Sequence, residues 1–171
     1  SDPADIRKTM GDEVLIGVSC YDDIGRAQQA LGRTDEAVKS FDLALAQRKD
    51  EPTYLLASGV AQFERGDFAT ARERLTHAAS VANKLTAAHY YLGRVAYAEK
   101  NFTLAVQKFQ LSSDEEASNL EYRYWLARAL DEGGQRQQAF NEFAAVADAL
   151  KPEQKAPVVP EKFVFSDSKP K

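Results

Sequence analysis

A period of 34 residues runs through this chain and constrains its fold more than any other feature. An alanine recurs at this interval, at Ala37, Ala71, Ala105 and Ala139. Twelve residues before each alanine stands a small residue, and four residues after it stands a large apolar one. These two columns are Gly25, Gly59, Gly93 and Ala127, and Phe41, Leu75, Phe109 and Phe143. A fixed period of this length is typical of proteins built by stacking similar structural units.

The two columns predict that each unit is a pair of antiparallel helices. Small residues let two helix backbones approach, and the bulky residue fills the space beside them. Glycine inside a helix costs about 1 kcal/mol relative to alanine, so three glycines in one column indicate a steric need. Between the helices, Gly32, Gly66 and Gly134 predict left-handed turns. The third unit has Lys100 and Asn101 there, and we expect Asn101 to adopt that conformation.

These residues resemble the tetratricopeptide repeat, a 34-residue helix-turn-helix unit. The resemblance is carried by the string that begins at Gly25 and includes Gly32, Ala37, Phe41 and Ala44, and by its three looser copies. It implies an all-α, right-handed α-solenoid of four repeats followed by an extended C-terminal tail. The expected units are 18–51, 52–85, 86–119 and 120–153.

Both ends of the chain fall outside the repeat pattern. Residues 1–17 are expected to form an N-terminal extension, of which Ser1–Thr9 is a vector remnant if Met10 is the native start. The alternative is an excised domain or mature chain that begins at Ser1.

The C-terminal residues 154–171 contain several prolines and are expected to be an extended tail. Its apolar residues Val159, Phe163 and Phe165 have two interpretations. They either cover the last apolar face of the solenoid or act as a ligand, bound in the chain's own groove, in a neighbouring molecule or by another protein.

Composition narrows the classes of partner. The formal net charge of −4 and the isoelectric point near 5.3 argue against binding to nucleic acid. No run of eighteen apolar residues exists, so no membrane span is expected. The single cysteine excludes an internal disulfide and fits a reducing compartment. We therefore expect a cytoplasmic protein, with the periplasm as the alternative.

In arrays of this family, the first helix of each unit lines a concave surface. Helical spacing predicts which side chains line it here. They are Arg26, Leu56, Val60, Phe63, Tyr90, Tyr91, Arg94, Tyr97, Tyr124, Trp125 and Arg128. Arginine, tyrosine and tryptophan dominate interaction hot spots, and the arginines would suit a peptide with acidic or carboxylate groups. The alternative is that these side chains only pack against, or pair with, neighbouring residues.

No constellation of catalytic residues is evident, so we expect neither an enzyme nor a cofactor. His77 and His89 could approach each other, but no third residue with metal-ligand spacing accompanies them, and no metal site is expected. Cys20 stands in an apolar stretch, which predicts a buried thiol.

The sequence therefore predicts a non-catalytic protein-protein interaction module, an adaptor, scaffold or chaperone, that binds a peptide segment of its partner in the groove. One alternative is a homo-oligomeric scaffold that assembles through its tail or its open solenoid end. Another is an interaction domain excised from a longer regulator or enzyme.

Overall fold

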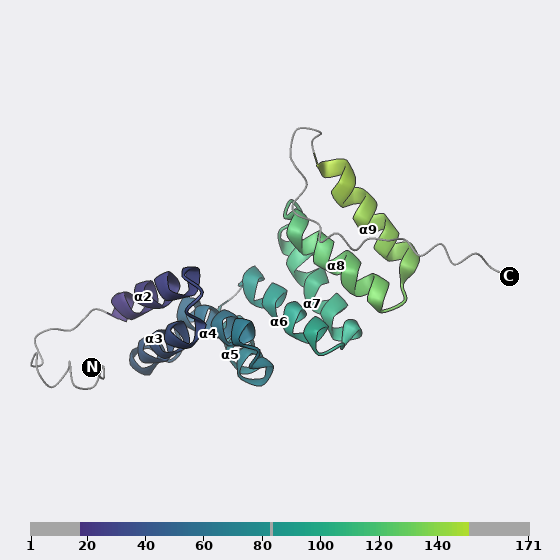
Figure 1. Ribbon diagram of the computed structural model, residues 1–171. Coiled ribbons are helices and arrows are strands. Elements are labelled where there is room, and N and C mark those ends of the chain that lie inside the picture. The colour runs from purple at the N-terminus through teal and green to yellow at the C-terminus, as the bar shows by residue number, and fades with distance from the viewer. Residues whose placement is uncertain (1–17, 83, 151–171) are drawn as a thin grey trace, which may run out of the picture.

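The computed structural model describes residues 18–82 and 84–150, and within them it contains eight α-helices and no strand (Figure 1). The helices are α2 (Val18–Ala30), α3 (Thr34–Gln47), α4 (Pro52–Arg65), α5 (Phe68–Val81), α6 (Thr86–Ala98), α7 (Phe102–Glu115), α8 (Leu120–Glu132) and α9 (Arg136–Ala149). The predictions for residues 1–17 and for the tail at 154–171, including Val159, Phe163 and Phe165, lie outside the described residues. None of the described helices is long and apolar enough to cross a membrane.

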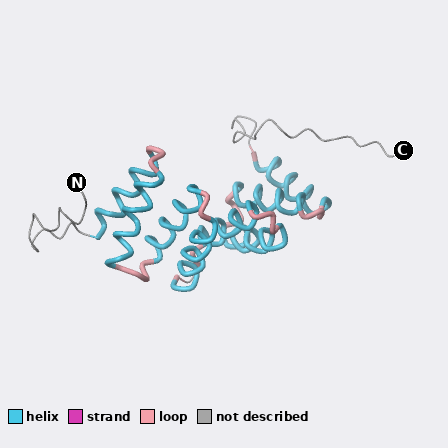
Figure 2. Tube along the Cα trace, turned by 60° about the horizontal axis from the view of Figure 1, so that its bottom comes forward, coloured by secondary structure: helices cyan, strands magenta, loops and turns pink. Residues whose placement is uncertain are grey.

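Each helix packs against its neighbours along the chain, and α4 also contacts α2 and α6 (Figure 2). The first helices of the four pairs, α2, α4, α6 and α8, form one layer, which we call the first-helix layer. The helices α3, α5, α7 and α9 form the second-helix layer. The predicted all-α solenoid of four helix-turn-helix repeats is confirmed.

Close packing within each pair explains the glycine column. A Cβ atom added to Gly25 would lie 2.6 Å from the ring of Phe41, and one added to Gly93 would lie 2.6 Å from the ring of Phe109. At Gly59 the nearest atom would be Leu75 Cγ at 2.7 Å. These separations are too short for any side chain, so the bulky residue of each second helix occupies the space that the glycine leaves.

The turns within the pairs confirm three glycine predictions and correct one about asparagine. Gly32, Gly66 and Gly134 have φ angles of 72°, 85° and 80°. In the third pair the left-handed residue is Lys100, with φ 61°, and the prediction that Asn101 would adopt this conformation was wrong. Asn101 instead precedes α7, and its side chain accepts a hydrogen bond from the Leu104 N–H at 3.2 Å. Because Asn101 caps α7 with a negative φ, the left-handed conformation of the turn is adopted by Lys100, the residue before it.

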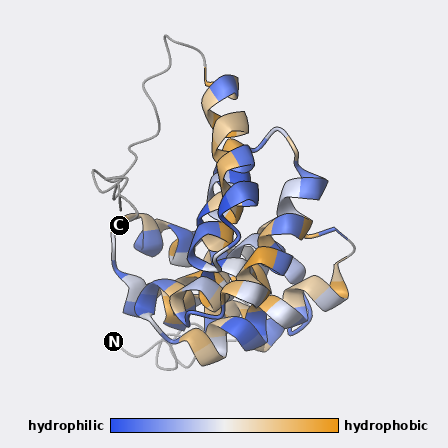
Figure 3. Ribbon diagram, turned by 90° about the vertical axis from the view of Figure 1, so that its right-hand side faces the viewer, coloured by the Kyte–Doolittle hydropathy of each residue, from blue (hydrophilic) through white to orange (hydrophobic). Residues whose placement is uncertain are grey.

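The apolar core is divided into clusters along the solenoid, and its composition changes from one end to the other. Between α2 and α5 the buried residues are mostly alanine, leucine and valine, with three aromatic residues, Tyr21, Phe41 and Tyr54, and few further rings packed against them. The cluster between α6 and α9 contains Tyr90, Phe109 and Tyr122, with Tyr97 and Trp125 packed against it. Figure 3 shows hydrophobic and hydrophilic residues alternating along the helices, as expected where each helix buries one side. The aromatic side chains are therefore concentrated in the C-terminal half.

Candidate functional site

Arg94, on α6, lies among aromatic rings supplied by three helices of the first-helix layer. Its guanidinium carbon is 3.9 Å from the centre of the Trp125 ring of α8. It is 5.4 Å from the ring centre of Phe63 on α4 and 5.7 Å from that of Tyr90 on its own helix. Attraction between a cation and the negative face of an aromatic ring favours this arrangement.

Arg128, one unit further along the same column, is held in the same way. Its guanidinium carbon lies 5.1 Å from the ring centre of Trp125 and 5.3 Å from that of Tyr97. Because both arginines lie against the Trp125 ring, their guanidinium carbons are at most about 9 Å apart, the sum of the two distances to that ring. The Tyr97 ring also meets Trp125 edge to face at 5.4 Å.

We call the resulting patch the aromatic-arginine surface. All six of its side chains are half-buried, so each keeps part of its area open to solvent. They are Phe63, Tyr91, Arg94, Tyr97, Trp125 and Arg128. Tyr91 joins the patch because its ring contacts both Phe63 at 6.2 Å and Tyr90 at 5.0 Å.

Within residues 18–82 and 84–150, neither Arg94 nor Arg128 forms an ion pair with a carboxylate. Arg94 Nη1 donates a hydrogen bond to the Tyr90 hydroxyl at 2.7 Å, and that hydroxyl donates to Glu121 Oε1 at 2.6 Å. The Tyr90 hydroxyl therefore positions Arg94 and separates it from the Glu121 carboxylate. The two guanidinium groups therefore retain hydrogen-bond donors for another molecule.

Arg26, the first arginine of this column, has a different environment. Asp22, four residues earlier, lies 2.7 Å from Arg26 Nε and neutralises it. The residues four positions before Arg94 and Arg128 are Tyr90 and Tyr124, so neither arginine has a carboxylate one turn before it on its own helix. Arg26 is therefore paired with a carboxylate, whereas Arg94 and Arg128, in the same column, are supported by aromatic rings.

The remaining residues predicted for this layer differ in exposure. Tyr90 and Val60 are only 4% and 9% exposed, so their side chains belong to the core more than to the surface. Leu56 is half-buried against the core. Tyr124 lies at the edge, 6.0 Å from both the Trp125 and Phe143 ring centres. Sequence reasoning missed Glu121, whose only signal was its place as an acid in the first turn of α8.

The tyrosines of this region are protonated over a wide pH range. Burial raises the pKa of Tyr90, and the hydrogen bond to Glu121 raises it further. Burial also raises the pKa of Tyr91, followed by the charge of Glu64, and it raises that of Tyr97 more than nearby Arg128 lowers it. The positive charge of the surface therefore comes from the two arginines alone, at neutral and mildly alkaline pH.

The prediction that the Cys20 thiol is buried was wrong, because Cys20 is exposed on α2. Its column mates Tyr54 and Tyr122 are each 8% exposed because a preceding helix pair covers them, whereas no described pair precedes α2. Of the two histidines, His77 places its Nε2 atom 2.9 Å from Asp50 Oδ1. In the part of the chain that the structure describes, no group of three or more potential ligands could hold a metal ion.

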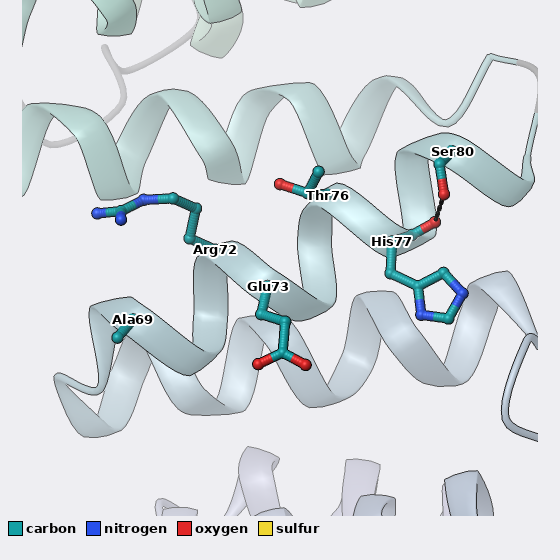
Figure 4. Close-up of a pocket in the computed structure, with 6 residues that line it drawn as sticks. All are labelled: Ala69, Arg72, Glu73, Thr76, His77 and Ser80. Carbon is teal, nitrogen blue, oxygen red and sulfur yellow. Dashed lines mark hydrogen bonds between the residues drawn. The ribbon is translucent and has the colours of Figure 1, made fainter.

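A shallow hollow lies on the second-helix layer, and every residue that lines it belongs to α5 (Figure 4). These residues are Ala69, Arg72, Glu73, Thr76, His77 and Ser80. A single helix cannot enclose a ligand, and Figure 4 shows its side chains spread along the helix without converging on one point. The hollow is therefore an open surface, too shallow to bury a small molecule as a ligand pocket does.

Comparison with known proteins identifies the repeat. A family model described as "Tetratricopeptide repeat" matches residues 23–82 and 63–117, which together span more than half of the chain. A search of curated proteins gives no significant match.

Solved structures share the fold at low sequence identity. A crystal structure of MamA is 17% identical, with a TM-score of 0.74 over 87% of this chain and 95% of that chain. MamA from Desulfovibrio magneticus RS-1 is 21% identical, with a TM-score of 0.72 over 82% and 77% of the two chains. YrrB, described as a TPR protein with an unusual peptide-binding site, is 19% identical, with a TM-score of 0.68 over 78% and 69%.

Proposed function

The chain belongs to the tetratricopeptide repeat family, whose members are generally non-catalytic interaction modules, and we propose that it binds a peptide segment of a partner protein. The proposed site is the aromatic-arginine surface on α4, α6 and α8, in the first-helix layer. One observation carries the proposal. Arg94 and Arg128 are supported by aromatic rings and have no carboxylate partner among the described residues.

The chemistry of a stacked arginine favours an acidic ligand. Stacking on a ring occupies the face of the guanidinium group, while its N–H donors lie in the plane and remain able to bind a carboxylate with two parallel hydrogen bonds. Arg94 uses one of its donors for the Tyr90 hydroxyl. The others, with those of Arg128, are the proposed contacts for side-chain or C-terminal carboxylates of the partner.

The spacing of the arginines restricts the partner further. Since their guanidinium carbons are at most about 9 Å apart, the two acidic groups would lie within a few residues of each other along an extended peptide. The half-buried rings around them would receive apolar side chains. Phe63, Tyr91, Tyr97 and Tyr124 provide these rings, and Leu56 extends the apolar area toward α4.

We assign different roles to the other predicted residues. Tyr90 and Val60 support the surface from the core, since little of either side chain is exposed. Arg26 lies at the N-terminal edge of the same layer, and its charge is neutralised by Asp22. It would therefore contribute little to the binding of an acidic peptide.

A direct test uses peptides selected from a random displayed library and then synthesised. Binding is followed by the fluorescence of Trp125, the only tryptophan in the chain, whose ring lies against both arginines. We expect selected peptides to contain acidic groups next to apolar residues. Binding should weaken below pH about 4, where carboxylates become protonated, and should remain constant up to pH about 9 because the tyrosines stay neutral.

Three matched variants test the role of the arginines. Arg94→Gln and Arg128→Gln should each weaken binding at least about tenfold, since a buried or half-buried charge-assisted hydrogen bond is worth about 1.5 to 3 kcal/mol. Arg26→Gln, in the same column, should change affinity less than about twofold because its charge is already paired. The variant that combines Tyr91→Ala with Arg94→Ala should abolish binding while leaving the helical circular dichroism unchanged. Equal affinity of the double variant and the parent chain would refute the proposal.

A further inference from the structure

The two ends of the solenoid carry the two most exposed large hydrophobic side chains among the described residues. Leu31, directly after α2, is 69% exposed, and Phe140, on α9, is 63% exposed. Figure 1 shows α2 and α9 at opposite ends of the row of helices. Neither residue belongs to the aromatic-arginine surface.

At the first end, α2 presents an apolar stripe. Cys20, Ile24, Ala27 and Leu31 are spaced by four, three and four residues, so they follow one side of the helix and its last turn. All four are exposed, and Ile24 is 44% exposed.

The columns of Cys20, Ile24 and Ala27 are buried in every later unit, whereas Arg65, Glu99 and Gly133, in the column of Leu31, are exposed. In the column of Ile24, Ser58, Leu92 and Leu126 are 0%, 6% and 1% exposed. In the column of Ala27, Ala61, Val95 and Ala129 are 0%, 1% and 0% exposed. In each case the preceding second helix takes part in the cover: Ala61 clusters with Val38 of α3, Val95 with Leu75 of α5, and Ala129 with Phe109 of α7. The stripe on α2 is therefore one half of a unit-to-unit interface.

At the other end, α9 presents the opposite half. Phe140 occupies the column of Val38, Arg72 and Val106. Val38 and Val106 pack against the following unit and are buried or half-buried, and Arg72 is exposed. Ala147, two helix turns after Phe140, is also exposed, whereas its column mates Leu45 and Ser113 are 4% and 6% exposed. No described helix follows α9 to cover these residues.

One internal contact shows how the two ends would meet. Between the second and third units, Arg72 of α5 forms an ion pair with Glu99, directly after α6. Two repeats after Arg72 comes Phe140, and two repeats before Glu99 comes Leu31. Arg72 and Glu99 therefore show that these two columns meet between neighbouring units, and at the two ends of the solenoid the same columns hold Phe140 and Leu31.

We propose that α9 of one copy packs against α2 of a second copy, in the register in which α7 packs against α8. The interface continues the internal unit-to-unit interface, and it places Phe140 of one copy beside Leu31 of the next. We choose a second copy as the partner because α9 carries the columns that cover a first helix inside the solenoid, and α2 carries the columns that are covered. Such a contact is heterologous, so an assembly of any length keeps one unpaired end of each kind and grows with concentration. This inference is independent of the proposed peptide binding.

The test measures the mass of the full chain in solution by sedimentation velocity over a wide range of concentration. We expect the mean mass to rise with concentration in the parent chain. Leu31→Glu and Phe140→Glu each place a charge in the proposed interface at an exposed position, so folding should be unaffected. Each variant alone should remain a monomer, because every contact needs both ends.

Mixing the two variants is the decisive measurement. The intact α9 end of Leu31→Glu would pack on the intact α2 end of Phe140→Glu, giving a 1:1 dimer that grows no further. Leu111→Glu is the matched control, since Leu111 is 43% exposed on the side of α7 and should leave self-association unchanged. The proposal is overturned if the parent chain is monomeric throughout, if either single variant still forms dimers, if the mixture stays monomeric, or if the control variant loses association as completely.

Discussion

The two halves of this solenoid share one backbone plan and differ in the chemistry of one column. In the N-terminal half the column begins with Arg26, paired with Asp22, and continues with Val60 in the core. In the C-terminal half it holds Arg94 and Arg128, both supported by Trp125. Asp22, four positions before Arg26, neutralises that arginine, whereas Tyr90 and Tyr124 stand four positions before Arg94 and Arg128. A repeat fold can thus gain or lose a charged surface without a change of shape.

The largest difference in stability between the halves should follow from the glycine column. Gly93→Ala should lower the free energy of unfolding by about 3 kcal/mol, because overpacked cores must shift to admit a new methyl group. The Phe109 ring that it would meet is held between Tyr90 and Trp125, with ring centres 5.9 and 6.1 Å away. Urea denaturation measures the loss.

Gly59→Ala is the matched change in the N-terminal half. Leu75 can rotate away more easily than a ring held on both sides, so the loss should be about 1 kcal/mol. A loss at Gly59 that equals or exceeds the loss at Gly93 would show that the aromatic cluster is no more rigid than the aliphatic one.

The next effect concerns the hydroxyl that links the third and fourth units. Tyr90→Phe removes hydrogen bonds to Arg94 and Glu121 and should lower the free energy of unfolding by about 1.5 kcal/mol, since both partners are charged. Tyr54→Phe, in the N-terminal half, removes a hydroxyl for which the described residues provide no hydrogen bond and should change stability little. Thermal unfolding of both variants compares them, and similar losses would contradict the assigned role of the Tyr90 hydroxyl.

Helix capping also differs between the halves. Asn101→Ala should cost about 1 kcal/mol, because the side chain of Asn101 accepts a backbone N–H at the start of α7. Arg33 occupies the equivalent position before α3 and makes no such bond, so Arg33→Ala should be close to neutral. Chemical denaturation would reveal the difference, and an unchanged midpoint for Asn101→Ala would argue against the cap.

The smallest expected effect is a gain. Lys100→Gly should stabilise the chain by about 0.5 kcal/mol, since glycine adopts a positive φ without the steric cost that a side chain incurs. Gly66→Lys, the reverse change in the N-terminal half, should be destabilising. If Lys100→Gly lowered the melting temperature, the left-handed conformation of Lys100 would not be a source of strain.

Most of the fold could be predicted because its determinants lie at fixed spacing. The glycine and aromatic columns locate each helix pair, and Gly32, Gly66 and Gly134 locate three of the four turns. The fourth turn was assigned to Asn101 because asparagine tolerates a positive φ, but its capping bond places that strain on Lys100. The sequence alone could not decide whether Lys100 or Asn101 has the positive φ, because the capping bond of Asn101 is visible only in the structure.

The candidate site could be predicted only as a list of side chains on one layer. Column position identified Arg26, Arg94 and Arg128 together, although their partners differ. Whether an arginine pairs with a carboxylate or stacks on a ring depends on side-chain directions across units. The burial of Tyr90 and the exposure of Cys20 depend likewise on which units lie on either side, a property of position in the stack that no single repeat encodes.

The confinement of helix contacts to near neighbours has a consequence for folding. The helix contacts join elements close in the sequence, so forming them closes only short loops and costs little chain entropy. Each added pair then propagates order to the next, as in a one-dimensional chain of coupled units. Folding should begin where the aromatic cluster joins α6, α7 and α8 and spread outward, and the terminal helices should open first when the protein unfolds.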